Sequence, residues 1–313
     1  MSTSVQQLVT TPTPTIAFPE ISSRIIQAVF PANIFVNTLT YYSIADRQVP
    51  SVNFVLQNIP TSQPTIVPVG ESEDFPVDMT PYSYAIVTPN FWADAVRIPR
   101  TVIEDIAVPV MEDYLQRITF KTMYTRDKHV EQTLNQGLSS TAHSPGTSNF
   151  VGFTGTGFDL ANTLSQLDIR TAKSVVEKDP NNYLITDIIV NAINAADLIR
   201  VPNYVSAFYY GRTDIGTQGA LQQATAPIGL LHGYNLWVSN VATVGTAYFL
   251  AANGANVNNM YSPLGFFVEK RPPTAEQLFW PSTDEFRVFI STRFKAYLAR
   301  SQAGYMITSL ATS

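Results

Sequence analysis

Apolar and polar residues alternate over two short runs that flank a long, proline-rich stretch near the start of the chain. Strand-forming residues fill Val52–Leu56 and Tyr82–Val87, and the acidic, turn-like run Gly70–Asp74 lies between them. Period-two alternation of β-branched and aromatic residues is typical of strands, whereas glycine beside acidic residues is typical of turns. The pattern therefore predicts a long two-stranded hairpin that projects from the body.

The composition of this stretch indicates that it cannot close a core by itself. Between Tyr41 and Asn90 the chain has seven prolines, one glycine, one arginine and no lysine. Each proline removes a backbone donor and fixes one dihedral angle, which keeps the chain extended. Because an isolated two-stranded hairpin is marginal in water, we expect a neighbouring molecule to hold this one. An irregular surface loop is the alternative interpretation.

Helical periodicity follows and predicts one long helix over residues 109 to 136. Pro109 suits the first turn, Glu112 and Asp113 suit the positive end of the helix dipole, and Gly137 suits the position just past the C-terminus. At 1.5 Å per residue this helix would be roughly 40 Å long, which makes it a spine. The apolar residues at helical spacing are Met111, Tyr114, Leu115, Ile118, Val130 and Leu134. The basic residues at intervening positions are Arg117, Lys121, Arg126 and Lys128.

The second half of the chain predicts alternating short strands and helices. Asp159 suits the N-cap of a second helix. The apolar residues that recur on that helix are Leu160, Leu164, Leu167 and Val175 or Val176. An apolar run of strand length, Tyr183–Val190, precedes Asn191, which suits the cap of a short helix through Leu198. These elements indicate an α+β body.

Charge is distributed unevenly over the last hundred residues. Residues 215–268 contain no Asp, Glu, Lys or Arg, although glycine, asparagine and proline recur there. Such a run suits strands and loops buried in a core or a subunit contact, and its glycines and prolines exclude a bilayer helix. Residues 286–298 place Arg287, Arg293 and Lys295 between apolar residues, which predicts a solvated strand.

The overall composition suggests a surface that other molecules cover. Charged residues make up 14 % of the 313 residues, against about a quarter in typical soluble domains. Since a monomer usually carries more surface charge, this deficit favours a protein covered by copies or partners. The net charge of −5 argues against a general grip on nucleic acid. The Thr/Pro-rich run Met1–Pro19 resembles an extended arm of a cytoplasmic product, since it lacks the basic and apolar parts of a signal peptide.

The sequence offers no catalytic, cofactor-binding or metal-binding residues. It has no cysteine, and His129, His143 and His232 stand at neither metal-ligand nor triad spacing. We expect His129 on the helix surface, His143 in a solvated loop and His232 in a structural role. The glycine-rich run 152–157 lacks the strand–turn–helix setting of a phosphate cradle. The acidic residues Glu71, Glu73, Asp74 and Asp78 predict a solvated tip or one that meets a basic patch on a neighbour.

Taken in order, four stretches resemble the major capsid proteins of tailed double-stranded DNA phages, whose HK97-like fold encapsulins share. The first is the extended loop before a spine helix, residues 41–136, which closes with Asp127–Gly137. The second is the strand and helix of Leu184–Leu198, and the third is the block Gly229–Tyr234 followed by Ala247–Leu250. The fourth is the closing strand, residues 286–303.

The resemblance implies a division of the chain into five parts. These are an N-terminal arm (1–40), an extended β-hairpin loop (41–90), a peripheral domain with the spine helix (91–158), an axial domain (159–265) and a return strand with the C-terminal end (266–313). Some relatives crosslink through a lysine in the extended loop, but this loop has none. The arm is too short for a scaffolding segment, and Asn191–Ala192 replaces the frequent Asn-Pro.

The resemblance further implies a non-enzymatic subunit of an icosahedral shell around double-stranded DNA, located in the virion after assembly in the host cytoplasm. Its partners would be copies of itself in rings of five and six, a portal, and packaged DNA held by weak contacts, with scaffolding and decoration proteins left open. The alternatives are an encapsulin-like compartment, a β-rich tail or fibre component, and a hydrolase. The residues predicted to make subunit or spine contacts are Phe54, Leu56, Phe75, Tyr84, Tyr114, Ile118 and Leu134.

Overall fold

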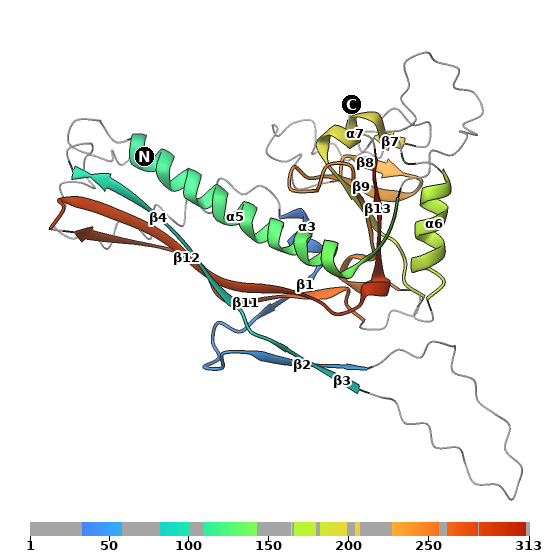
Figure 1. The fold of residues 1–313 in the computed structure, drawn as a ribbon, viewed down its shortest axis with the longest axis horizontal. Helices are drawn as coiled ribbons and strands as arrows, with labels where there is room; N and C mark the ends of the chain where they lie inside the picture. Colours follow the sequence, from blue (N-terminus) through green and yellow to red (C-terminus); the bar gives the residue numbers. More distant parts are fainter. Residues whose placement is uncertain are drawn as a thin grey trace, which may run out of the picture.

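The structure, a computed structural model, describes most of the chain in several segments. Their ranges are 33–57, 82–100, 109–142, 164, 166–179, 182–198, 204–206, 227–256, 262–280 and 282–310. Two sheets and one long helix organise these segments, and a separate hairpin projects from them (Figure 1). Among the described helices, none is long and apolar enough to cross a membrane.

A four-stranded sheet and the helix α5 form one layered unit. The strands stand in the order β1 (Thr40–Ser43), β11 (Gly265–Trp280), β12 (Glu285–Leu298) and β4 (Asn90–Pro99). The helix α5 (Pro109–Gly137) has 29 residues and lies along one face of this sheet (Figure 1). The sheet contacts α5 through alternate residues of β4 and β12, such as Trp92, Ile290 and Phe294.

Two prolines interrupt β11 where the sheet can tolerate them. The short strand β1 pairs only with Phe266–Glu269, so the rest of β11 has β12 as its one partner among the described strands. The register of β11 against β12 shifts between Glu269 and Thr274, the interval that contains Pro272 and Pro273. Because proline cannot donate to a ladder, it is confined to such edges and irregularities.

A seven-stranded sheet forms the second unit. Its strands, in spatial order, are β5 (Ser139–Ala142), β13 (Gly304–Thr308), β10 (Ala247–Leu250), β6 (Asp187–Val190), β9 (Tyr234–Val238), β8 (Gly229–Leu231) and β7 (Tyr204–Ser206). The helices α6 (Gln166–Val176) and α7 (Ala192–Leu198) accompany it (Figure 1). Its central strands β6 and β10 are buried along their whole length, which places the main core here.

Short elements complete the described chain. The helix α3 (Ile34–Thr38) packs near α5, and two 3-10 turns, η2 (Ala252–Gly254) and η3 (Ser301–Ala303), flank strands of the second sheet. The turn between β8 and β9 consists of His232 and Gly233, with φ of 52° and 89°. Two consecutive residues with positive φ match the twist of a tight hairpin, which favours glycine at the second position.

The predicted hairpin exists as a separate two-stranded sheet. The strands β2 (Val52–Gln57) and β3 (Tyr82–Val87) pair antiparallel, with Val52 opposite Val87 and Val55 opposite Tyr84. They run away from the four-stranded sheet on the side opposite α5 (Figure 1). The acidic run 70–74 between them lies outside the described residues.

The long helix and the strand–helix unit are confirmed. The helix spans Pro109–Gly137, one residue beyond the predicted end. The backbone N–H of Ile193 donates to Asn191 Oδ1 at 3.1 Å, so Asn191 does cap α7. The strand before it is shorter than predicted, because Tyr183 makes only an isolated bridge and β6 begins at Asp187.

Three expectations need correction. Of the apolar residues predicted for the second helix, Leu164 and Val176 are buried as expected but Leu167 is exposed, and α6 buries Ile169 and Ala172 in addition. The predicted cap Asp159 and Leu160 lie outside the described residues. The strand β12 is not simply solvated, since Val288, Ile290 and Phe294 are buried beneath α5. The long strands β4 and β11 were not predicted as strands.

Candidate assembly interface

A buried carboxylate ties the segment before the first strand to α5. Asp127 Oδ1 accepts hydrogen bonds from the backbone N–H of Phe35 at 2.8 Å and of Val36 at 3.1 Å. Burial raises the pKa of Asp127 to about 7, although these two donors act in the opposite direction. The helix α3 thereby obtains partners for donors that its first turn leaves unpaired.

A buried ion pair ties α5 to the four-stranded sheet. Arg126 Nη2 lies 2.7 Å from Glu269 Oε1, and Tyr41 Oη donates to Glu269 Oε2 at 2.5 Å. The guanidinium also lies over the ring of Phe267, 5.0 Å from its centroid. The sequence places Arg126 among the basic residues between the apolar positions of the helix, yet its side chain is buried. The reason is that its partner Glu269 extends from β11 under the helix.

A second buried carboxylate ties α5 to the seven-stranded sheet. Glu131 Oε1 accepts hydrogen bonds from Tyr248 Oη at 2.8 Å, Asn135 Nδ2 at 2.8 Å and the Thr243 hydroxyl. Lys128 Nζ lies 2.9 Å from the other carboxylate oxygen. Burial raises the pKa of Glu131, but its hydrogen-bond donors outweigh burial and hold that pKa below its ordinary value. The helix α5 is therefore fastened to both sheets.

The inner face of the hairpin packs on its own chain. The ring of Phe54 stacks on Phe266 with centroids 4.0 Å apart, and Tyr42 and Tyr297 also contact it through their rings. Leu56 packs against the same small cluster, which includes buried Val52 and Val87 at the base of the hairpin. This aromatic contact anchors the base of β2 and β3 to the four-stranded sheet.

The outer face of the hairpin is apolar and uncovered in this single chain. The register places Val55 opposite Tyr84, Ile86 opposite Asn53 and Tyr82 opposite Gln57, all on the face turned away from Phe54. The exposed fractions are 57 % for Val55, 59 % for Tyr82, 75 % for Tyr84 and 69 % for Ile86. Four large apolar side chains in a row on a thin ribbon form an exposed patch of the kind that marks a binding surface.

The residues predicted to make contacts fall into three groups. Phe54 and Leu56 lie on the inner face of the hairpin, and Tyr84 lies on the outer face. Ile118 and Leu134 belong to α5 and are buried. Phe75 and the side chain of Tyr114 lie outside the described residues.

Three residues of the outer face, Val55, Tyr82 and Ile86, are not among the predicted contacts. The alternation in residues 52–56 and 82–87 shows that two faces exist. It does not show which face meets the body, because both faces carry apolar residues.

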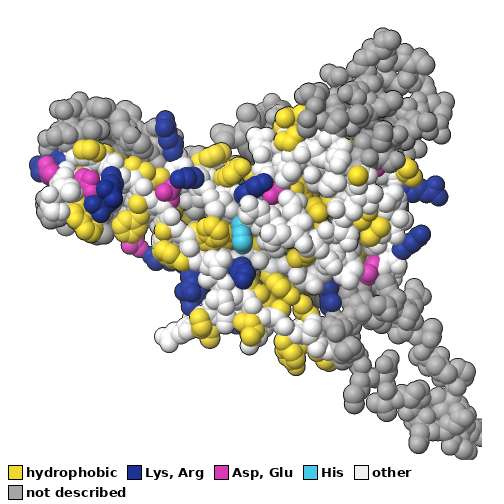
Figure 2. Space-filling model, viewed as in Figure 1, with side chains coloured by type: hydrophobic (Ala, Val, Ile, Leu, Met, Phe, Trp, Pro, Cys, Tyr) yellow, Lys and Arg dark blue, Asp and Glu magenta, His cyan; other side chains and the backbone are white. Residues whose placement is uncertain are grey.

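A second exposed apolar feature lies on α5. Phe120 and Tyr124, four residues apart, are 51 % and 41 % exposed. Side chains four residues apart share one helix face. Figure 2 shows hydrophobic side chains gathered both along this part of the molecule and at the lower edge, near the hairpin base.

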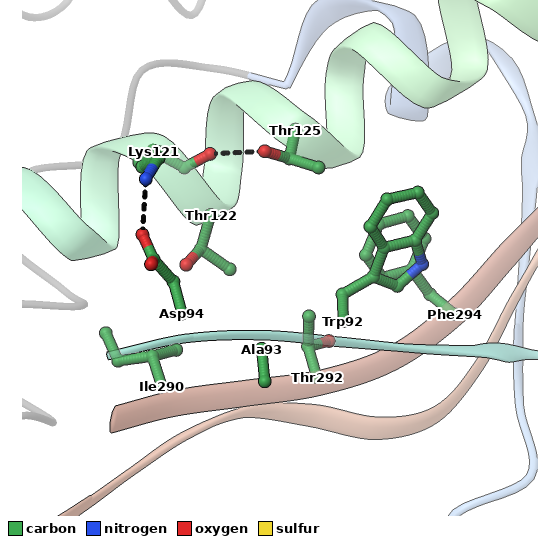
Figure 3. A pocket seen from close by; sticks show the side chains of 9 residues that line it. All are labelled: Trp92, Ala93, Asp94, Lys121, Thr122, Thr125, Ile290, Thr292 and Phe294. Atoms are coloured by element: carbon green, nitrogen blue, oxygen red, sulfur yellow. Dashed lines mark hydrogen bonds and ion pairs between the residues drawn. The ribbon is translucent and has the colours of Figure 1, made fainter. Parts of the chain in front are cut away.

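A small groove between α5 and β4 contains no catalytic constellation. Its volume is about 180 Å³, and Lys121 pairs with Asp94 at 2.6 Å on one side while Thr122, Thr125 and Trp92 line the rest (Figure 3). In the described part of the chain, no group of three or more His, Asp and Glu side chains could hold a metal ion.

The position of His129 corrects an expectation. This residue was expected on the solvated surface of the helix. Its ring instead lies 5.4 Å from Trp92 and 5.8 Å from Phe294, and it is half-buried. Burial, with a smaller contribution from Lys295, lowers the pKa of His129, so its neutral form packs against these rings.

Comparison with solved structures identifies the fold. A protein from Mycobacterium phage Che8 matches with a TM-score of 0.61 at 14 % identity, covering 89 % of this chain and 92 % of that one. The capsid of cyanophage P-SCSP1u matches with a TM-score of 0.56 at 14 % identity, covering 90 % and 89 %. A virus-like particle from Pyrococcus furiosus matches with a TM-score of 0.54 at 10 % identity, covering 94 % and 99 %.

These similarities define the class of fold. No family profile matches the sequence, and no curated protein is detectably similar to it. The similarity therefore lies in the three-dimensional structure. The chain has the HK97-like capsid fold, an α+β architecture with a projecting hairpin and a long helix, as the resemblance implied.

Proposed function

We propose that this protein is the major subunit of an icosahedral capsid that encloses double-stranded DNA. The observation that carries the proposal is the uncovered outer face of the hairpin on a chain with a capsid fold. Four apolar side chains on a two-stranded ribbon are stabilised only when another surface covers them. Each would contribute roughly 1.5–3 kcal/mol on full burial. A copy of the same chain supplies that surface in a closed symmetric shell.

The fold suggests how the parts divide this work. The four-stranded sheet with α5 would form the peripheral domain, and the seven-stranded sheet would form the axial domain. The boundaries inferred from sequence put β5 in the peripheral part and β13 in the C-terminal end, and both strands pair within the seven-stranded sheet. The chain therefore crosses between the two units at Leu138, before β11 near Leu264, and again near Arg300. The protein would act mechanically, without catalysis, as part of the virion.

The buried ion pair and hydrogen bonds of α5 support this mechanical role. Arg126, Asp127 and Glu131 lie within two turns of one helix and join it to β11, α3 and the seven-stranded sheet. A helix that is bound to β11, to α3 and to the seven-stranded sheet would transmit force between the two sheets as a rigid element. Such a link suits a shell whose subunits each touch many others and bear internal pressure together.

Removal of the hairpin tip tests the proposal. A chain that lacks residues 60 to 78 should remain folded, as measured by circular dichroism, but form no shells in negative-stain electron microscopy. The unmodified chain, expressed in parallel, should form closed particles. Normal particles from the shortened chain would remove the role assigned to the hairpin.

The contents of the particles separate the capsid from a second candidate. The similarity to the virus-like particle from Pyrococcus furiosus keeps a cargo-holding compartment under consideration. Nuclease-protected double-stranded DNA in particles from the natural source supports the capsid. Particles that hold an enzyme and no nucleic acid support the compartment.

A further inference from the structure

The contact between α5 and the four-stranded sheet contains a group of rings around His129. The ring of His129 lies 5.4 Å from Trp92 of β4 and 5.8 Å from Phe294 of β12, measured between centroids. Trp92 also stacks on Phe294, with centroids 5.4 Å apart. Both residues line the groove between α5 and β4 (Figure 3). His129 therefore occupies the place where the helix meets these two strands.

The polar side chains at this place are short of hydrogen-bond acceptors. Trp92 Nε1 and Arg126 Nε are buried and find no hydrogen-bond partner among the residues that the structure describes. The guanidinium of Arg126 lies over the same Phe294 ring, 5.8 Å from its centroid. His129 Nε2 is buried without a partner as well. We name Trp92, Arg126, His129 and Phe294 the His129 cluster. Because a neutral imidazole has one donor and one acceptor nitrogen, His129 is the member of the cluster that can offer a lone pair.

The charged groups on the surrounding elements do not favour a protonated imidazole. Burial, and to a smaller extent the positive charge of Lys295 on β12, lowers the pKa of His129. Asp127, the carboxylate nearest in sequence, accepts two backbone N–H groups of α3. The other carboxylates of α5, β4 and β11 near the cluster are each paired with a cation, in the pairs Glu131–Lys128, Asp94–Lys121 and Glu269–Arg126.

Protonation of His129 would remove the lone pair that the cluster can offer. The imidazolium carries an N–H on both nitrogens, so Nε2 would join Trp92 Nε1 and Arg126 Nε as a third buried donor without an acceptor. A buried donor without a partner destabilises the closed arrangement, and a buried charge does so more strongly. Water relieves this cost, so the protonated ring is stable only where it reaches solvent.

We propose that His129 is an acid-sensitive latch between α5 and the four-stranded sheet. The neutral ring closes the contact against Trp92 and Phe294, and the protonated ring opens it by moving to solvent. The latch belongs to the single chain and does not depend on self-assembly. Its contribution to stability is complete above about pH 6.5, the ordinary pKa of histidine, and is lost as the pH falls through the lowered pKa of the folded state.

Asp127 gives the same helix a second response, of opposite sign. Burial raises its pKa to about 7, so its contribution to stability is lost as the pH rises through that value. Asp127 and His129 lie two residues apart on α5, and one contacts α3 while the other contacts β4 and β12. The two groups together define a range of pH in which the helix holds both neighbours.

The fluorescence of Trp92 tests the latch directly. The chain has three tryptophans, so Trp237→Phe with Trp280→Phe leaves Trp92 as the one emitting residue. Its emission is followed from about pH 8 to about pH 5, the range in which histidine titrates. As the pH falls, the emission should weaken and shift to longer wavelength, because opening exposes the indole to water. Far-ultraviolet circular dichroism should stay constant, because the opening is local.

Two further substitutions in this chain assign the shift to one histidine. His129→Gln keeps a neutral polar side chain that cannot titrate, so the shift should disappear. His232→Asn is the matched control and should keep the shift. Burial also lowers the pKa of His232, and asparagine tolerates its positive φ of 52°. A shift that persists in His129→Gln, or no shift in the chain with both histidines, would overturn the proposal.

Hydrogen exchange in the natural chain provides a second measurement that needs no change of tryptophan. Amide exchange in α5 and β4, corrected for its intrinsic dependence on pH, should rise severalfold between about pH 7 and about pH 5. Exchange in β6 and β10 of the other sheet should stay constant. Unchanged exchange in α5 and β4 would overturn the proposal even if the tryptophan variants fail to fold. An equal rise in His129→Gln would overturn it as well.

Discussion

At the scale of single residues, Asp127 links the stability of this fold to pH. Its folded pKa of about 7 lies above its ordinary value near 4, so the folded state retains a proton that the unfolded state releases. The corresponding stability is complete below about pH 4 and is lost as the pH rises through 7. The cause is burial of a carboxylate whose partners are two backbone N–H groups.

The first prediction concerns this pH dependence. Asp127→Asn keeps the acceptor for Phe35 and Val36 but cannot titrate, so the decline in the free energy of unfolding between pH 4 and 7 should become shallower. Urea unfolding at several pH values measures it. Asp284→Asn, at an exposed turn, is the control and should retain the slope of the natural chain. An unchanged slope in Asp127→Asn would contradict the interpretation.

The second prediction concerns the buried pair of Arg126 and Glu269. Arg126→Met should lower the free energy of unfolding by about 3–5 kcal/mol, because it leaves the Glu269 carboxylate buried without its cation. Lys121→Met on the same helix removes an exposed pair with Asp94 and should cost less than about 1 kcal/mol. Chemical denaturation of both variants gives the comparison. Equal decreases in the free energy of unfolding for the two variants would contradict the prediction that the buried pair contributes more to stability than the exposed one.

At the scale of elements, the two faces of the hairpin have opposite roles. The inner face holds the ribbon on its own chain through Phe54, and the outer face presents Tyr84 and Ile86 to another molecule. Stability and assembly should therefore respond to different substitutions on neighbouring residues of one ribbon.

The third prediction separates these roles. Phe54→Ala should lower the free energy of unfolding by about 2 kcal/mol or more, because it removes a stacked ring. Tyr84→Ser with Ile86→Ser should change stability by less than about 0.5 kcal/mol but abolish shells, since these side chains are largely exposed in the single chain. Thermal unfolding and electron microscopy measure the two effects. Asn53→Ser, on the outer face, is the control and should preserve both.

Elements differ in how well sequence predicts them. The helix α5 is predictable because its start, end and apolar spacing are local signals at Pro109, Gly137 and the residues between them. The strand β4 cannot be predicted in this way. Apolar and polar residues alternate in it only after Phe91, and the strand ends at Pro99. Its pairing partner β12 lies almost two hundred residues away, and local propensity does not register such a partner.

At the scale of the whole molecule, exposed apolar surface and the charge deficit have one explanation. The outer hairpin face and the patch of Phe120 and Tyr124 on α5 are two apolar surfaces that are exposed in the described part of a single chain. A shell built from copies covers surfaces of this kind repeatedly.

The fourth prediction follows from these uncovered surfaces. Assembly should depend on the concentration of the chain, because each contact forms between copies. Light scattering during dilution should show dissociation below a threshold concentration. Scattering that falls only in proportion to dilution at every concentration, with the mass of a single chain, would contradict self-assembly.

The candidate interface was only partly predictable. The sequence indicates the hairpin, Tyr84 and an acidic segment suited to a basic patch on a neighbour. It also indicates Phe54 and Leu56 as subunit contacts, whereas in this chain both pack on its own sheet.

The sequence by itself determined the projecting hairpin, the long helix, the strand–helix unit that ends at Leu198 and the shortage of charged residues, since each depends on local spacing or on composition. Tertiary structure decided which hairpin face remains free, why Arg126, Asp127 and Glu131 can be buried, and that β4 and β11 pair with β12. The physical reason is that burial and charge neutralisation depend on partners distant in sequence. Those partners are defined only once the two sheets have closed around α5.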